Sequence, residues 1–242
     1  MSAPEISKSK AANSELSTGL DEAKLRAQVI EQSAREPSPT RAQLAVRHRV
    51  VLTIVMLVPL LIFIACGGIR VGPRLDGLVL QTALGSGILA AGLAVLGVGR
   101  GRSMLGRPRS WLLLQVLLTP GLLLGWRVLI SACYPQMMVE WTDRPGLRCF
   151  TLSVILACAP LLGLLWLRRG SDPLHPRLTA AALGAAVGAG AWVLVDLWCP
   201  VGYVPHLLLG HVMPLLLLIA TSALLGSRVI AVGEGSAPLT GR

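Results

Sequence analysis

The sequence predicts an all-α integral membrane protein: a six-transmembrane-helix bundle with a short, partly disordered cytoplasmic N-terminal tail. Hydrophobic residues make up 53% of the 242-residue chain and charged residues only 14%, which is a low charged fraction for a soluble domain. The hydrophobic residues also occur in long blocks, whereas an amphipathic helix of a soluble protein shows only an apolar stripe. Residues 50–69 include no charged side chain, and a stretch of about 20 such residues spans the hydrocarbon of a bilayer.

Six hydrophobic blocks follow one another along the chain, and each is long enough for one helical span. The blocks are residues 50–69, 78–98, 111–133, 150–167, 178–197 and 207–224. The first follows a polar segment and has no cleavage site of small residues, so it is predicted to be a retained helix and not a signal peptide. The fifth is rich in alanine and glycine, which allows helices to pack closely in lipid. The predicted domains are the N-terminal tail 1–49, the transmembrane domain 50–224 and the C-terminal tail 225–242.

The distribution of basic residues predicts the orientation in the membrane. With the N-terminus in the cytoplasm, 17 of the 22 Lys and Arg residues lie in cytoplasmic segments, four lie in outer loops, and Arg127 lies within a span. Such an excess on the inner side follows the positive-inside rule. We therefore expect a multi-pass protein of a bacterial inner membrane with both termini cytoplasmic. The net charge of +10 is interpreted as topology, so membrane lipid is an expected contact and direct nucleic acid binding is not.

The N-terminal tail contains one segment with the pattern of a helix. Its first 16 residues are rich in Ser, Ala, Lys and Glu, a composition typical of disorder. Thr18 then precedes Asp21 by three residues, as in a capping box. Apolar positions that include Leu25, Val29 and Ile30 recur at helical spacing, and these three are the candidate partner-binding residues. A helix this short is marginal alone in water, so it either docks on a partner or frays beside the membrane.

Two charged residues, Arg127 and Asp196, fall inside the predicted spans, at comparable depth in the third and the fifth. An unpaired charge in lipid costs roughly a few kcal/mol or more, so the two are predicted to form an intramembrane ion pair. A proton or substrate relay would normally need more carboxylates than one. A small polytopic transporter or channel is therefore the alternative interpretation of the chain, and polar residues that would line its pathway are scarce.

The cysteines gather at one level of the predicted bundle. Four of the five lie at outer span ends: Cys66, Cys133, Cys149 and Cys199. Cys158 lies mid-span, and His206 and His211 lie in the outer half of the last hairpin. Thiols on the periplasmic side can oxidise, and thiolates with imidazoles are ligands for soft or borderline metals. No CxxC or HxxxH spacing is present, so both an oxidant and a metal remain open as the signal, and a thiol oxidoreductase is not expected.

A set of residues between positions 148 and 200 forms a recognisable pattern. It consists of Arg148-Cys149, Ser153, Pro160, Leu167-Arg168-Arg169, the loop 171–176, the Ala/Gly-rich fifth span and Cys199-Pro200. With this pattern the chain resembles the NrsF-type family of membrane anti-sigma factors, in which a cysteine opens one span and a Cys-Pro closes the next. The chain departs from the family after Pro200, where an acidic residue often follows. It also carries His206 and His211 where the common pattern is aromatic and aliphatic.

The resemblance implies a regulator and not an enzyme, with no cofactor. The cytoplasmic tail would bind an extracytoplasmic-function sigma factor and keep it from RNA polymerase. Cys149 and Cys199 would be the outer sensor of oxidants or heavy metals, and their reaction would shift the fourth and fifth spans and release the partner. The secondary sensor candidates are the other outer-face residues, Cys66, Cys133, His206 and His211.

Overall fold

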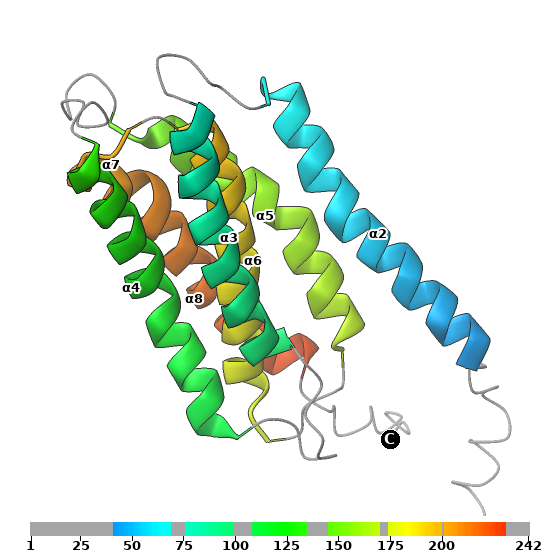
Figure 1. Cartoon of the computed structure of the whole chain (residues 1–242). Helices are drawn as coiled ribbons and strands as arrows, with labels where there is room; N and C mark the ends of the chain where they lie inside the picture. The colour runs from blue at the N-terminus through cyan, green and yellow to red at the C-terminus, as the bar shows by residue number, and fades with distance from the viewer. Residues whose placement is uncertain are drawn as a thin grey trace, which may run out of the picture. The chain divides into compact units, whose positions relative to one another are not determined.

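All regular structure that the computed structural model describes is helical (Figure 1). The described residues are 41–68, 76–98, 108–134, 145–169, 174–199 and 201–230. The helices are α2 (Arg41–Ala65), α3 (Asp76–Val98), α4 (Arg109–Cys133), α5 (Leu147–Leu167), α6 (Pro176–Trp198), α7 (Val204–Leu207), the π-helical turn η2 (Leu208–Val212) and α8 (Met213–Val229). Six stretches of these helices are long and apolar enough to cross a membrane. The predicted all-α class with six spans is therefore confirmed.

The chain divides into two units, Met1–Arg47 and His48–Arg242. The described part of the first unit is the beginning of α2. The predicted tail helix with Leu25, Val29 and Ile30 lies outside the described residues. The remainder of α2 and all the helices that follow it lie in the second unit.

Helix α2 begins before, and ends earlier than, the predicted first span 50–69. It starts at Arg41, because arginine and glutamine are good helix formers and the helix continues beyond the apolar block. It ends at Ala65, and Gly67 and Gly68 follow with φ of 106° and 58°, a left-handed conformation that often ends a helix. Hydropathy therefore locates the span but not the ends of the helix.

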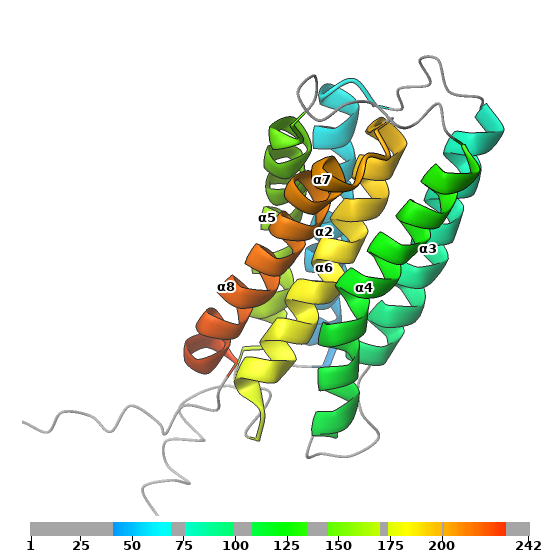
Figure 2. The same cartoon turned by 90° about the vertical axis from the view of Figure 1, so that its left-hand side faces the viewer.

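Helix α6 lies at the centre of the second unit, among α3, α4, α5 and α8 (Figures 1 and 2). Of the six spans it is the most buried, and α2 is the least. Its small residues let the neighbouring helices approach, since Gly184 lies against Ser222 of α8 and Ala180 lies against Gly226. In lipid such faces associate by close van der Waals contact. The contact between α6 and α8 is accordingly the most extensive in the unit.

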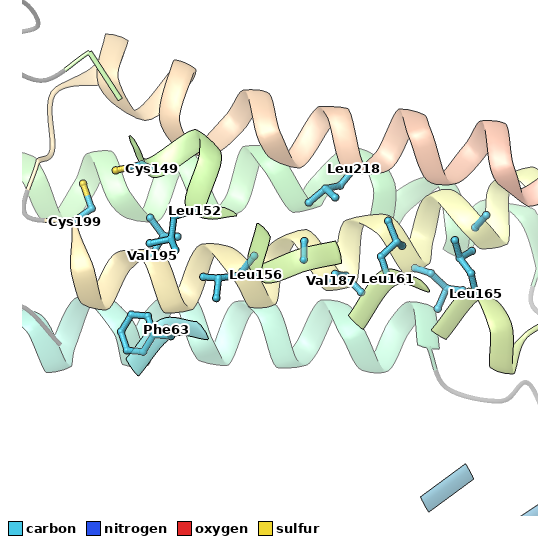
Figure 3. Close-up of a cluster of buried hydrophobic side chains, with 14 of the residues drawn as sticks. Phe63, Cys149, Leu152, Leu156, Leu161, Leu165, Val187, Val195, Cys199 and Leu218 are labelled. Carbon is cyan, nitrogen blue, oxygen red and sulfur yellow. The ribbon is translucent and has the colours of Figure 1, made fainter. Parts of the chain in front are cut away.

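A cluster of buried hydrophobic side chains links α2, α5, α6 and α8 (Figure 3). It includes Phe63 of α2, Leu156 of α5 and Val195 of α6, and it ends at Cys149 and Cys199. We call this end of the unit, where α5 begins and α6 ends, the thiol end. Many other leucine, isoleucine and valine side chains are exposed, as expected for surfaces that face lipid, whose tails are as apolar as leucine.

Candidate metal and thiol site

Four side chains with metal-binding or redox chemistry meet at the thiol end. Cys149 lies in the first turn of α5, Cys199 directly follows α6, His206 lies in α7 and His211 lies in η2. Their sulfur and imidazole nitrogen atoms all lie within 4.8 Å of one another. Each of the four residues is at most 3% exposed. Figure 3 shows the two cysteine side chains close together at the end of the hydrophobic cluster.

His206 joins the two thiols. Its Nε2 atom lies 3.1 Å from Sγ of Cys199 and 3.5 Å from Sγ of Cys149. One nitrogen therefore contacts both sulfurs, and the tautomer of the imidazole decides whether it donates or accepts each hydrogen bond. The three groups form a compact polar cluster in an otherwise apolar environment.

The π-helical turn explains why the side chains of His206 and His211 lie close together although the two residues are five positions apart. In an α-helix residues five apart are separated by about 140° around the axis, because each residue turns by about 100°. In a π turn the hydrogen bonds run from residue i to residue i+5 and so bring such residues above one another. The ring centroids of His206 and His211 are 5.9 Å apart. Trp192 of α6 supports this position, because its ring meets that of His211 edge-on at 5.1 Å.

Two glycines allow α5 to begin directly against η2. Gly146 precedes α5 with φ of 93°, and a Cβ atom there would lie 2.9 Å from the carbonyl oxygen of His206. A Cβ atom on Gly210 would lie 3.0 Å from the carbonyl oxygen of Gly146 and 3.1 Å from Cβ of Cys149. Both approaches are too close for a larger residue to fit without a shift of the backbone. The missing side chains thus bring Cys149 within reach of the histidines.

Arg127 holds the segment that carries Cys199. One terminal nitrogen of its guanidinium donates to the carbonyl oxygens of Cys199 at 3.0 Å and Val201 at 3.2 Å. Its Nε atom lies 3.8 Å from Oδ1 of Asp196, and Nδ1 of His211 lies 3.9 Å from the same oxygen. All three side chains are fully buried. The structure thus brings the two predicted partners Arg127 and Asp196 together and places them directly beside the thiol site.

The structure separates the remaining sensor candidates into two groups. His206 and His211 lie with Cys149 and Cys199, whereas Cys66 and Cys133 are exposed and lie outside the cluster. Cys158, which the sequence places mid-span, is also exposed and lies outside the cluster.

Cys199 is 1% exposed, and Val201 and Leu207 in the turn that follows α6 are buried as well. Hydropathy could not predict this arrangement, because the π turn and the close contacts of Gly146 and Gly210 leave no trace in it. A glycine close in sequence to each of Cys149 and His211 is the signal that could have indicated a close approach.

Comparison with known proteins identifies the family. A family model described as NrsF, negative regulator of sigma F, matches residues 33–231. Comparisons with the curated proteins and with the solved structures give no match. The matched residues include all six spans and the four residues of the thiol end. The chain therefore belongs to the NrsF family of negative regulators of sigma F, whose partner is a sigma factor.

Proposed function

We propose that this chain holds an extracytoplasmic-function sigma factor at a bacterial inner membrane and releases it when an oxidant or heavy metal reaches Cys149 and Cys199 from the periplasm. Membership of the family supports the role of an anti-sigma factor. The main support for a sensor role of Cys149 and Cys199 is the buried contact of His206 with both thiols at the thiol end. Two thiols that share one imidazole respond as a unit to any reagent that binds or oxidises sulfur.

Both signals act on the same pair of atoms. An oxidant would take two electrons from the two thiols, the sulfurs would join as a disulfide, and the two thiol protons would leave to solvent. A heavy metal would displace the same protons and bind the two thiolates. A disulfide or a bound metal ion would favour the arrangement of α5 and α6 that holds the two sulfurs close together. A signal can shift a conformational equilibrium only if it stabilises one arrangement more than the other.

The proposed orientation of the chain in the membrane rests on the distribution of charged residues. The excess of Lys and Arg in the segments predicted to be cytoplasmic favours a cytoplasmic N-terminus by the positive-inside rule. The thiol end then faces the periplasm, where disulfides persist. The N-terminal tail, with Leu25, Val29 and Ile30, then faces the compartment in which a sigma factor acts.

The contacts of the buried polar residues favour this role over a transporter or channel. Gln115 donates to the carbonyl oxygen of Ala182 at 3.0 Å, and Arg127 donates to the turn after α6. Thr119 bonds back to its own helix at the carbonyl oxygen of Gln115. Gln115 and Arg127 thus connect different elements of the unit, and Thr119 is satisfied within α4, so none of these contacts favours a transport pathway.

Release of the partner tests the proposal. The full chain would be purified together with its co-expressed sigma factor, and the complex would be exposed to hydrogen peroxide or to cadmium ions. We expect the sigma factor to dissociate from the unaltered chain and to stay bound in Cys149→Ser and in Cys199→Ser.

Cys158→Ser is the matched control, since Cys158 is exposed and lies on the same helix as Cys149. It should respond like the unaltered chain. Full release of the sigma factor from both Cys149→Ser and Cys199→Ser would contradict the proposed sensor and would favour Cys66 and Cys133 as the sensing residues.

A further inference from the structure

We infer that Cys149, Cys199, His206 and His211 form a single four-ligand site for a divalent d¹⁰ metal ion, Zn²⁺ or Cd²⁺. The inference rests on the proposed function and names the ligand of its sensor. It differs from a sensor made of two cysteines because it gives each histidine a place in the coordination sphere. Two sulfur and two nitrogen donors in tetrahedral arrangement are typical of zinc sites.

The geometry is close to that of a closed tetrahedral site. Zinc bonds of about 2.3 Å to sulfur and 2.0–2.1 Å to nitrogen place the ligand atoms about 3.3–3.8 Å from one another. The contacts of His206 with Cys199 and Cys149 measure 3.1 and 3.5 Å, and no pair among the four ligand atoms exceeds 4.8 Å. The atoms would therefore need to close by at most about 1.5 Å around an ion.

His211 has an unmet requirement that a metal would satisfy. Its ring is 2% exposed, and neither ring nitrogen has a hydrogen-bond partner among the described residues. A buried polar nitrogen without a partner is costly. Nδ1 faces Oδ1 of Asp196 at 3.9 Å, which leaves Nε2 on the opposite side of the ring for the ion. A carboxylate behind a metal-binding imidazole is a common arrangement that fixes the tautomer and the orientation of the ring.

The charge of the ligand set favours a divalent ion over a monovalent one. Cys149 and Cys199 would bind as two thiolates, so a divalent ion gives a neutral site. Neutrality matters here because the four ligands are buried, and a net charge in a medium of low dielectric constant is expensive. A monovalent copper ion would leave one negative charge uncompensated, since Arg127 already faces Asp196. The buried site therefore favours Zn²⁺ or Cd²⁺.

Cobalt titration of the purified, chelator-treated full chain tests the site directly. Co²⁺ is a spectroscopic substitute for Zn²⁺, and it gives thiolate-to-cobalt charge-transfer and ligand-field bands characteristic of tetrahedral coordination. We expect one Co²⁺ per chain, complete displacement by Zn²⁺ or Cd²⁺, and release of thiol protons on binding.

Variants at the histidines distinguish the four-ligand site from a pair of thiols. His206→Ala and His211→Ala should each weaken binding by more than about 100-fold, since even residues that only support a ligand contribute 10–100-fold. His175→Ala is the control. His175 is the N-cap of α6, at the end of that helix opposite to Cys199, so this variant should bind Co²⁺ as the unaltered chain does. Unchanged affinity and spectrum in both His206→Ala and His211→Ala would overturn the inference.

A measurement on the unaltered chain removes any dependence on how variants fold. Cys149 and Cys199 are buried, so they should react slowly with an alkylating reagent even in the metal-free chain, and bound Zn²⁺ should slow their reaction further. The exposed Cys66 and Cys158 should react at the same rate with and without the ion. Absence of both cobalt binding and protection would overturn the site while leaving an oxidant-sensing thiol pair intact. Stoichiometric binding without release of the sigma factor by metal or peroxide would instead support the site and contradict the proposed function.

Discussion

Arg127 contacts both the backbone of the turn after α6 and a buried carboxylate at the thiol end. Its guanidinium donates to the carbonyl oxygens of Cys199 and Val201 and faces Asp196 at 3.8 Å. Asp196 in turn faces His211. A single buried cation therefore fixes the turn that carries one thiol and orients the carboxylate behind one imidazole.

Removal of either charge should destabilise the chain. In Arg127→Met or Asp196→Asn the remaining buried group loses its partner, which typically costs about 3–5 kcal/mol for a buried pair. The double variant should recover part of this loss but not all, because the two carbonyl oxygens held by Arg127 stay without their donor. Unfolding in mild detergent by a graded denaturant measures the difference.

Thr151→Ala is the control for these variants, since its hydroxyl is exposed and bonds only to its own helix. It should unfold close to the unaltered chain. Losses from the two charge variants that simply add in the double variant would show that Arg127 and Asp196 do not interact.

The sequence predicts the spans well and the π turn not at all. Hydropathy reports only whether a stretch is apolar, and the block 207–224 includes Leu208–Val212 without a break. For the same reason a spacing of five between His206 and His211 does not indicate a metal site, because such residues diverge in an α-helix. The pairing of Cys149 with Cys199 is different, since two antiparallel neighbouring spans bring residues at their facing ends to one level.

The junction of α5 and η2 should be sensitive to one methyl group. Gly210→Ala would place Cβ 3.0 Å from the carbonyl oxygen of Gly146 and 3.1 Å from Cβ of Cys149. Relief of such crowding requires a shift that separates Cys149 from the histidines, and overpacking of this kind costs about 1–3 kcal/mol. We expect weaker cobalt binding and a lower melting temperature.

Gly190→Ala in α6 is the matched control, because a Cβ atom there meets nothing within 4 Å. Alanine also favours a helix over glycine by up to about 1 kcal/mol, so this variant should be as stable as the unaltered chain or more so. Equal metal affinity and stability in Gly210→Ala would contradict the requirement for close approach.

At the scale of the whole molecule, six spans and membership of the family agree with what the sequence predicts. The sequence could predict the spans because hydropathy follows the membrane directly. The charge asymmetry predicts a tail on one side of the membrane and the thiol end on the other. The sequence could not define the four-residue site, which depends on packing between α5, α6 and the segment 201–212.

Binding of the sigma factor should depend on the apolar face of the tail. In the double variant Leu25→Asp and Val29→Asp, two carboxylates replace the side chains predicted to lie against the partner. We expect co-purification with the sigma factor to be lost and membrane insertion to be unchanged. Ser7→Asp with Ser9→Asp adds the same charge outside the predicted helix and should bind normally. Retained binding by the Leu25 and Val29 variant would place the contact in another cytoplasmic segment.

The helices of the second unit differ in how closely they pack. The contact between α6 and α8 is the most extensive, and the glycines and alanines along it leave little space between the two helices. Helix α2 is the least buried span. It touches α5 where Val51 and Val55 fit against Gly163, and its Phe63 reaches the hydrophobic cluster. We therefore expect α2 to be the span that is displaced most easily. Along the 25 residues of α2, which measure about 37 Å, a tilt of about 10° moves one end by about 6 Å. If an ion bound at the proposed site tilts α2, a contraction of little more than an ångström around the four ligand atoms would become a displacement several times larger at one end of that helix.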